Sequence, residues 1–249
     1  RIVRWRRRVG IMVNVFFKKK SAAEFAAELS ALLGPQLVSV LLHGSAASGN
    51  FVEGHSDQNL IVVLKDGSLP ALKRALPAVW RWRRQGQPIP VFFSMDGLAR
   101  SVEDFPVEFL DLRDGYRVLA GADVIAPLKI EGTHLRHQIE HELKGKLLRL
   151  RRSYFEVGGR RKELLRVMVQ SVSGTLVLFR HALRLFGEEP PVKKIDALDA
   201  LARKISFDAD VLREIANMKT GAKPAGDPDV LLDRYLKAID DVLAAVDAL

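Results

Sequence analysis

Two short segments of the chain carry residue types suited to phosphate and metal chemistry. Gly44 and Ser45 end one apolar run, and Asp57 and Asn59 stand just before another. A glycine lets the backbone approach a phosphate closely, and a serine adds a hydroxyl and an N–H. Residues 57 and 59 alternate along a strand, so both side chains point to one face. The Asp57 carboxylate and the Asn59 amide oxygen are therefore candidate ligands for Mg²⁺.

The segment from Leu41 to Leu64 resembles the signature of the DNA polymerase β-like nucleotidyltransferase superfamily. After Gly44-Ser45 comes a polar loop, and Ser56-Asp57-Gln58-Asn59 leads into the second apolar run. The spacing is most similar to that of the aminoglycoside adenylyltransferases. The resemblance implies that a nucleoside triphosphate is bound by Gly44, Ser45, Ser56, Asp57 and Asn59. It further implies that Asp57 is the catalytic residue that binds Mg²⁺, and that Asn59 is its neighbour at the metal.

The sequence departs from the family pattern at two of its three carboxylates. Asn59 replaces the second metal-binding aspartate. The family's third acid lies on a later strand, and the best match, residues 88–93, has Pro90 at that position. One carboxylate should bind Mg²⁺ weakly unless the triphosphate supplies most ligands. Glu108 and Asp111 lie downstream as candidate substitutes.

Three functions follow as hypotheses. The first, implied by the resemblance, is Mg-dependent transfer of a nucleoside monophosphate from a nucleoside triphosphate to a small-molecule or protein acceptor. The second is a catalytically impaired nucleotide-binding or interaction module, which the missing acids favour. The third is a component of a HEPN ribonuclease and minimal-nucleotidyltransferase toxin–antitoxin pair. That hypothesis rests on Arg136 and His141, which fit the loose HEPN spacing and would have to line one cleft.

Two further patterns lie in the second half of the chain. His137-Gln-Ile-Glu-His141 matches the inverted zinc-protease motif, with two imidazoles at i and i+4. A solvated helix face is the simpler interpretation. The basic stretch over residues 144–162 lacks interleaved aromatic residues, so we also interpret it as a solvated face.

Composition narrows the class of protein. The 249 residues contain 48% apolar residues and no cysteine, which excludes disulfides and thiolate metal sites. No run of about 18 apolar residues is present, so we expect no membrane span. We expect a cytoplasmic protein. The net charge is +9, but residues 1–20 hold eight of the 39 basic residues and no acid, so the rest has 31 bases and 30 acids. This distribution argues against a nucleic-acid partner.

The pattern of apolar residues predicts two domains after a basic N-terminal extension at residues 1–19, of which residues 1–11 should contribute nothing to the fold. Residues 20–126 should form an α/β (α+β) nucleotidyltransferase domain with a small mixed sheet. A capping box at Ser21 and Glu24 should start its first helix. Strands are predicted at 37–42, 60–64, 89–93 and 116–119, with a helix at 69–84. Residues 127–249 should form an all-α bundle, with helices through 139–154 and over 163–186, 193–205, 209–219 and 229–248.

Overall fold

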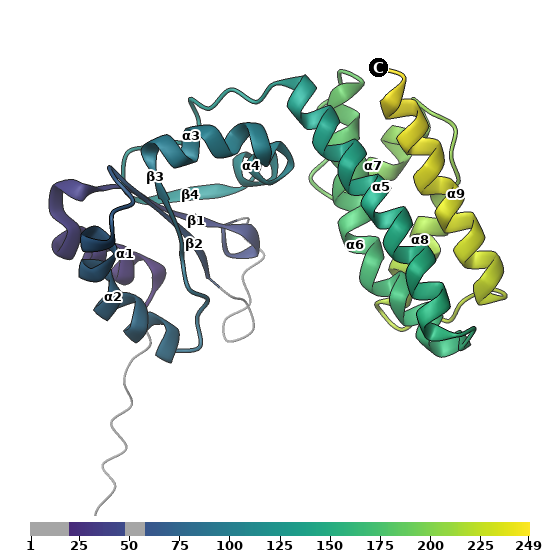
Figure 1. The fold of residues 1–249 in the computed structure, drawn as a ribbon, viewed down its shortest axis with the longest axis horizontal. Helices are drawn as coiled ribbons and strands as arrows, with labels where there is room; N and C mark the ends of the chain where they lie inside the picture. Colours follow the sequence, from purple (N-terminus) through teal and green to yellow (C-terminus); the bar gives the residue numbers. More distant parts are fainter. Residues whose placement is uncertain (1–19, 48–57) are drawn as a thin grey trace, which may run out of the picture.

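The computed structural model describes residues 20–47 and 58–249 (Figure 1). The predicted extension at residues 1–19 and the loop residues Ser56 and Asp57 lie outside the described residues. The described chain forms a small mixed sheet with helices on its two faces, followed by a bundle of longer helices (Figure 1). None of the described helices is long and apolar enough to cross a membrane.

Four strands form the sheet, in the order β3-β2-β1-β4. β1 (Leu37–His43) is antiparallel to both β2 (Asn59–Leu64) and β4 (Tyr116–Gly121), whereas β2 is parallel to β3 (Val91–Ser94). The two central strands are apolar on both faces because helices cover both. The four predicted strands are confirmed, although β3 begins two residues later than expected.

One face of the sheet is covered by α1 (Ala22–Leu33) and α2 (Leu69–Arg84). The predicted capping box at the start of α1 is present, since Ser21 and Glu24 each accept a hydrogen bond from the other's backbone N–H. Phe25 of α1 stacks on Trp82 of α2 with ring centroids 4.6 Å apart. Both rings belong to the hydrophobic core between these helices and the sheet.

The other face is covered by α3 (Met95–Asp104) and α4 (Pro106–Arg113). These two helices were not predicted from the sequence. Both are short, and α4 is buried on most sides, so it lacks the apolar stripe by which a helix is usually detected. Their starts do carry local signals. Ser94 Oγ accepts a hydrogen bond from the N–H of Gly97, and Pro106 occupies the first turn of α4.

The bundle contains α5 (Gly132–Val157), α6 (Arg161–Leu185), α7 (Lys194–Ala202), α8 (Ala209–Met218) and α9 (Pro228–Asp247). Each predicted helix of this half is present, with ends that differ by a few residues. The predicted stripe on α5 is buried against α6 and α9. Of the predicted residues, Ile139, Leu143, Leu147 and Leu150 are buried and Tyr154 is partly buried, and Leu135 extends the stripe toward the start of the helix.

α4 packs against both halves of the molecule. Its Val107 and Leu110 belong to the core of the bundle, whereas Phe109 and Leu112 belong to the core beneath the sheet. α4 is therefore one element through which the sheet and the bundle are held together. The domain boundary between residues 126 and 127 stays a prediction, and α4 lies on its N-terminal side.

Candidate functional site

The ends of β1 and β2 bring Gly44 and Asn59 together. His43 of β1 pairs with Asn59 of β2, and Gly44 follows directly with φ at +75°. A Cβ atom on Gly44 would lie 3.4 Å from Asn59 Nδ2. Two of the five predicted nucleotide-binding residues thus lie side by side in the structure. Ser45 continues the backbone in the short 3-10 helix Gly44–Ala46, while Ser56 and Asp57 fall outside the described residues.

Gln58 anchors the start of β2 and so fixes the position of Asn59. Its backbone N–H donates to Gln87 Oε1 at 3.0 Å, and its side-chain oxygen accepts from the N–H of Ala22 at 3.0 Å. These bonds tie the start of the strand to the N-terminus of α1 and to the segment that precedes β3. Asn59 is therefore held at a defined level beside His43 and Gly44.

The segment before β3 presents Ile89 and Val91, rather than Pro90, to the face that carries Asn59. Val91 pairs with Ile61, which packs on the α3–α4 side with the other residues of that face. Pro90 is buried, and Phe92 packs against the α1–α2 core. Trp82 Nε1 also donates to the carbonyl oxygen of Pro88 at 2.9 Å, which holds the segment against α2. By alternation from Val91, Pro90 lies on the opposite face from Asn59, so the register does not favour Pro90 as the position of the third acid.

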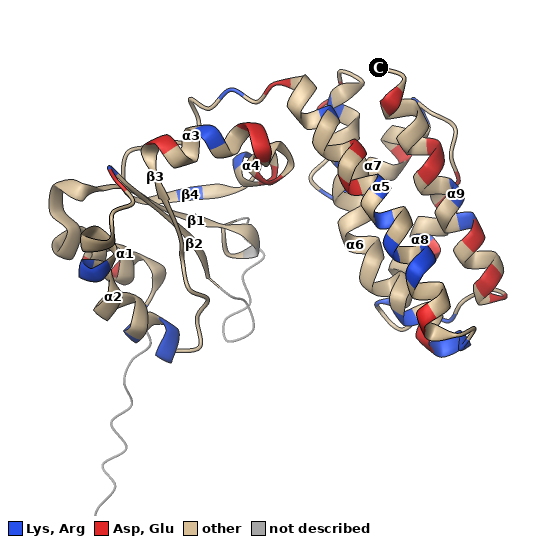
Figure 2. Ribbon diagram, in the orientation of Figure 1, with Lys and Arg blue, Asp and Glu red and all other residues tan. Residues whose placement is uncertain are grey.

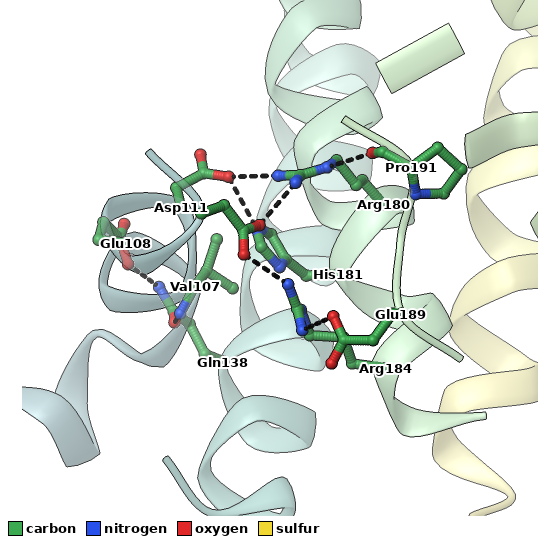
Figure 3. Close-up of polar contacts among 10 residues, drawn as sticks. Val107, Glu108, Asp111, Gln138, Arg180, His181, Arg184, Glu189 and Pro191 are labelled. Carbon is green, nitrogen blue, oxygen red and sulfur yellow. Dashed lines mark hydrogen bonds and ion pairs between the residues drawn. The ribbon is translucent and has the colours of Figure 1, made fainter. Parts of the chain in front are cut away.

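A cavity of about 230 Å³ adjoins this end of the sheet. His43, Ile61 and Val91 line one side, and Glu108 of α4 is the one carboxylate among its lining residues in the described part of the chain. Gln138 Nε2 of α5 donates to Glu108 Oε2 at 2.7 Å (Figure 3). Burial lowers the pKa of His43, which favours the neutral imidazole. Of the two substitute acids suggested by sequence, Glu108 is thus the one beside the candidate site.

Asp111, the other suggested substitute, is engaged in an ion-pair cluster between α4 and α6 (Figure 3). Arg180, whose side chain is 6% exposed, contacts Asp111 Oδ1 at 2.9 Å and Asp114 Oδ2 at 2.5 Å. His181 Nε2 lies 2.7 Å from Asp111 Oδ1, and Arg184 binds Asp114. Burial alone would raise the pKa of Asp111, but the bond from His181 and the nearby positive charges hold it below its usual value.

The same cluster contains a set of possible metal ligands. One oxygen each of Asp111 and Asp114 and one ring nitrogen of His181 lie within 4.8 Å of one another. However, the guanidinium groups of Arg180 and Arg184 already neutralise both carboxylates. A cation would have to displace two buried arginines. The residues therefore fit a structural ion-pair cluster and do not fit a metal centre.

The motif on α5 does not assemble in the way that a zinc protease requires. Glu140, which would be the catalytic base, instead pairs with Arg136 Nε at 2.7 Å and with Lys144 Nζ at 3.6 Å. Arg136 also donates to the carbonyl oxygen of Asp247. Moreover, Arg136 and His141 line different cavities, so the cleft that the HEPN hypothesis requires is not formed by them.

Lysine and arginine residues recur along α5 (Figure 2). Several basic residues of the stretch are exposed and pair with nearby acids. Within it, Arg152 binds Glu156 and Arg149 approaches Glu142, all on the surface of α5. Lys146 is the exception, because it is half-buried between α5 and α6, and this burial lowers its pKa. These contacts favour the interpretation of the stretch as a solvated face.

A comparison with known proteins supports the predicted fold. No family model and no curated protein matches the chain. Among solved structures, the spectinomycin adenyltransferase AAD(9) from Enterococcus faecialis, solved with ATP and spectinomycin, matches with a TM-score of 0.52 at 11% sequence identity. The chain has a nucleotidyltransferase fold. The match covers 89% of this chain and 98% of the other, so the nucleotidyltransferase-like structure includes the helical half.

The nucleotidyltransferase fold was predictable from the segment around Gly44 and Asn59, but two features of the site were not. The first is the apolar Ile89 on the site-facing side of the segment before β3. The register of the parallel pair is the signal that identifies it. The second is His134, which lines one cavity together with His137 and His141. Its spacing of three residues from His137 is visible in the sequence, but the cavity is not.

Proposed function

We propose that this chain binds a nucleoside triphosphate over the ends of β1 and β2 and transfers its nucleoside monophosphate to a hydroxyl of a small-molecule or protein acceptor. The proposal is carried by the contact between Gly44 and Asn59 within a nucleotidyltransferase fold. Gly44 lacks a side chain where phosphate must come close, and glycine adopts its φ of +75° without strain. The spectinomycin adenyltransferase of the same fold was solved with ATP.

The donor set suits Mg²⁺ that arrives with the nucleotide. Asn59 lies beside Gly44 through its Nδ2 atom and carries one neutral amide oxygen, and Asp57, two residues earlier, supplies a carboxylate by sequence. Mg²⁺ in such sites takes one or two carboxylates and fills its remaining positions with phosphate oxygens and water. When bound, it neutralises charge that develops on the transferred phosphoryl group. Asp57 and Asn59 are the residues that would hold it.

We assign to Glu108 the role of accepting the proton of the acceptor hydroxyl. It is exposed, it lies in the cavity that adjoins His43, and it is held by Gln138. A carboxylate at hydrogen-bond distance from an acceptor hydroxyl can remove its proton as the oxygen attacks phosphorus. The apolar walls of the cavity, formed by residues such as Phe93 and Phe109, would pack the body of the acceptor.

The test has a binding stage and a turnover stage. Thermal shifts with each of the four nucleoside triphosphates, with and without Mg²⁺, should identify one that stabilises the protein, and pyrophosphate release should follow with a suitable acceptor. Asp57→Ala should abolish both responses. Glu108→Gln should leave nucleotide binding unchanged and reduce turnover by about 100-fold, the usual contribution of a general base. If no triphosphate shifts the melting temperature, the proposal is wrong.

The second candidate function is an impaired nucleotide-binding or interaction module, and a specific observation favours it. The residue on the site-facing side of the segment before β3 is Ile89, which is 55% exposed and carries no charge. The described part of the site therefore lacks an acid at residue 89, the position that the register places beside Asn59. This candidate predicts nucleotide binding without pyrophosphate release from any triphosphate, and it is excluded if turnover depends on Glu108.

A further inference from the structure

A second cavity, of about 430 Å³, lies where α3 and the start of α4 face α5. Five of the side chains that line it are metal-binding types without a partner. None of the five forms a hydrogen bond or ion pair within the part of the chain that the structure describes. Three come from α5 and two from the end of α3: His134, His137, His141, Glu103 and Asp104. Glu140, next to His141, contrasts with them because two cations already hold it.

The spacing along α5 brings two of the imidazoles together. His137 and His141 are four residues apart, so they lie one above the other on the same helix face, with Cβ atoms about 6 Å apart. Both residues are exposed, and both line the cavity. His134 stands one turn earlier and lines the same space.

Carboxylates approach from another element. Glu103 and Asp104 end α3, which packs against α5 across the cavity. Two neutral imidazoles and a carboxylate are a donor set typical of zinc and its neighbours, whereas Mg²⁺ and Ca²⁺ prefer oxygen ligands alone. In the described residues, no guanidinium group pairs with Glu103 or Asp104, whereas Arg180 pairs with Asp111.

We propose that His137 and His141, together with a carboxylate of Glu103 or Asp104, form a binding site for a zinc-class divalent cation that links α3 to α5. In the described residues, the ligand atoms of these side chains are not yet gathered within 4.8 Å. The proposal requires the exposed side chains to turn toward one another across the cavity. The site goes beyond the proposed nucleotidyl transfer and needs neither a nucleotide nor an acceptor.

A cation at this site would also connect the helical bundle to the sheet. The cavity shares Phe105 and Glu108 with the smaller cavity beside His43. A cation bound between α3 and α5 therefore ties the helical bundle to the sheet next to the nucleotide site. Bound metal also raises thermal stability, because it binds the folded chain in preference to the unfolded one.

The experiment uses the full chain without an affinity tag, stripped of metal, and ZnCl₂ alone as the probe. Calorimetry at pH 7.5 should show one Zn²⁺ per chain with a dissociation constant of about 10 µM or tighter. Co²⁺ should give the visible absorption of a four-coordinate site. Lowering the pH to 5.5 should weaken binding, because the imidazoles must be neutral to coordinate.

Two double variants test the histidine ligands and the carboxylate ligands separately. His137→Gln with His141→Gln should weaken Zn²⁺ binding by at least tenfold, and Glu103→Gln with Asp104→Asn by about tenfold. Asp96→Asn, at the other end of α3 and outside the cavity, is the matched control and should bind as the parent does. All of these residues are exposed, and circular dichroism verifies that each variant folds.

Three results would overturn the proposal. They are the absence of saturable Zn²⁺ binding, binding that survives the double histidine substitution, and binding that is unchanged by the double acid substitution. The last would confine the metal to α5 and remove the link between the helices. Since no nucleotide is present in these assays, their failure leaves the proposed nucleotidyl transfer untouched, and failure to bind any triphosphate leaves the metal site untouched.

Discussion

Ile61 of β2 is paired with Val91 of β3 in a parallel ladder, on the sheet face that also carries Asn59. Extending that register by two residues places Ile89 beside Asn59. Ile89 and Val91 are both about half exposed, whereas Pro90 between them is buried. An acid that is to act with Asn59 therefore belongs at residue 89.

Restoring two carboxylates on this face should increase metal-dependent chemistry. Asn59→Asp alone should strengthen binding of Mg²⁺ with triphosphate by about tenfold, equivalent to about 1.4 kcal/mol, but give little turnover. Asn59→Asp with Ile89→Glu should release pyrophosphate faster than the parent. The matched control is Asn59→Asp with Pro90→Glu, whose new acid would face the α1–α2 core. Equal rates for the two double variants would show that the register argument is wrong.

Gly44 should be sensitive to any side chain, for two separate reasons. Gly44→Ala adds strain at a φ of +75° and places a Cβ 3.4 Å from Asn59 Nδ2. The strain should cost about 1 kcal/mol, and the contact should weaken nucleotide binding. Gly86 has a φ of +84° with nothing near its Cβ position, so Gly86→Ala is the matched control. It should lower the melting temperature similarly and leave nucleotide binding unchanged.

The cluster around Arg180 should be a major determinant of stability at the junction. Arg180→Ala removes the guanidinium that joins Asp111 and Asp114, which leaves Asp111 with His181 and Asp114 with Arg184. The expected loss in urea unfolding is about 3 kcal/mol. Arg152→Ala breaks the exposed pair with Glu156 and should cost less than about 1 kcal/mol. Similar losses for the two variants would contradict the structural role of the cluster.

Asp111 should also make stability depend on pH in the acid range. Its pKa in the folded chain lies below the ordinary value of 3.8, so the unfolded chain binds the proton more readily. The stability that Asp111 contributes is therefore present above pH 3.8 and is lost as the pH falls through its lowered pKa. Melting temperatures measured from pH 6 to pH 2.5 should fall more steeply for the parent than for Asp111→Asn. Parallel curves would refute the assignment.

Local patterns in the sequence were sufficient for most of the elements and for part of the site. The capping box at Ser21 and the apolar stripe on α5 each depend on neighbours within a turn or two, and both are present. The sequence also placed Gly44 and Asn59 at the ends of two predicted strands, and these strands pair in the structure. These features need no knowledge of distant contacts.

The tertiary structure decided what no local pattern contains. Whether residue 89 or residue 90 faces Asn59 depends on the register between β2 and β3, since a slip of one residue turns every side chain to the other face. Asp111 and Glu108 are equivalent acids in the sequence, and both lie on α4. Packing of α4 against distant segments brings Asp111 to Arg180 of α6, whereas Glu108 lines the cavity beside His43. The sequence by itself determined the fold and the candidate nucleotide loop, and packing between distant segments determined which acids can reach it.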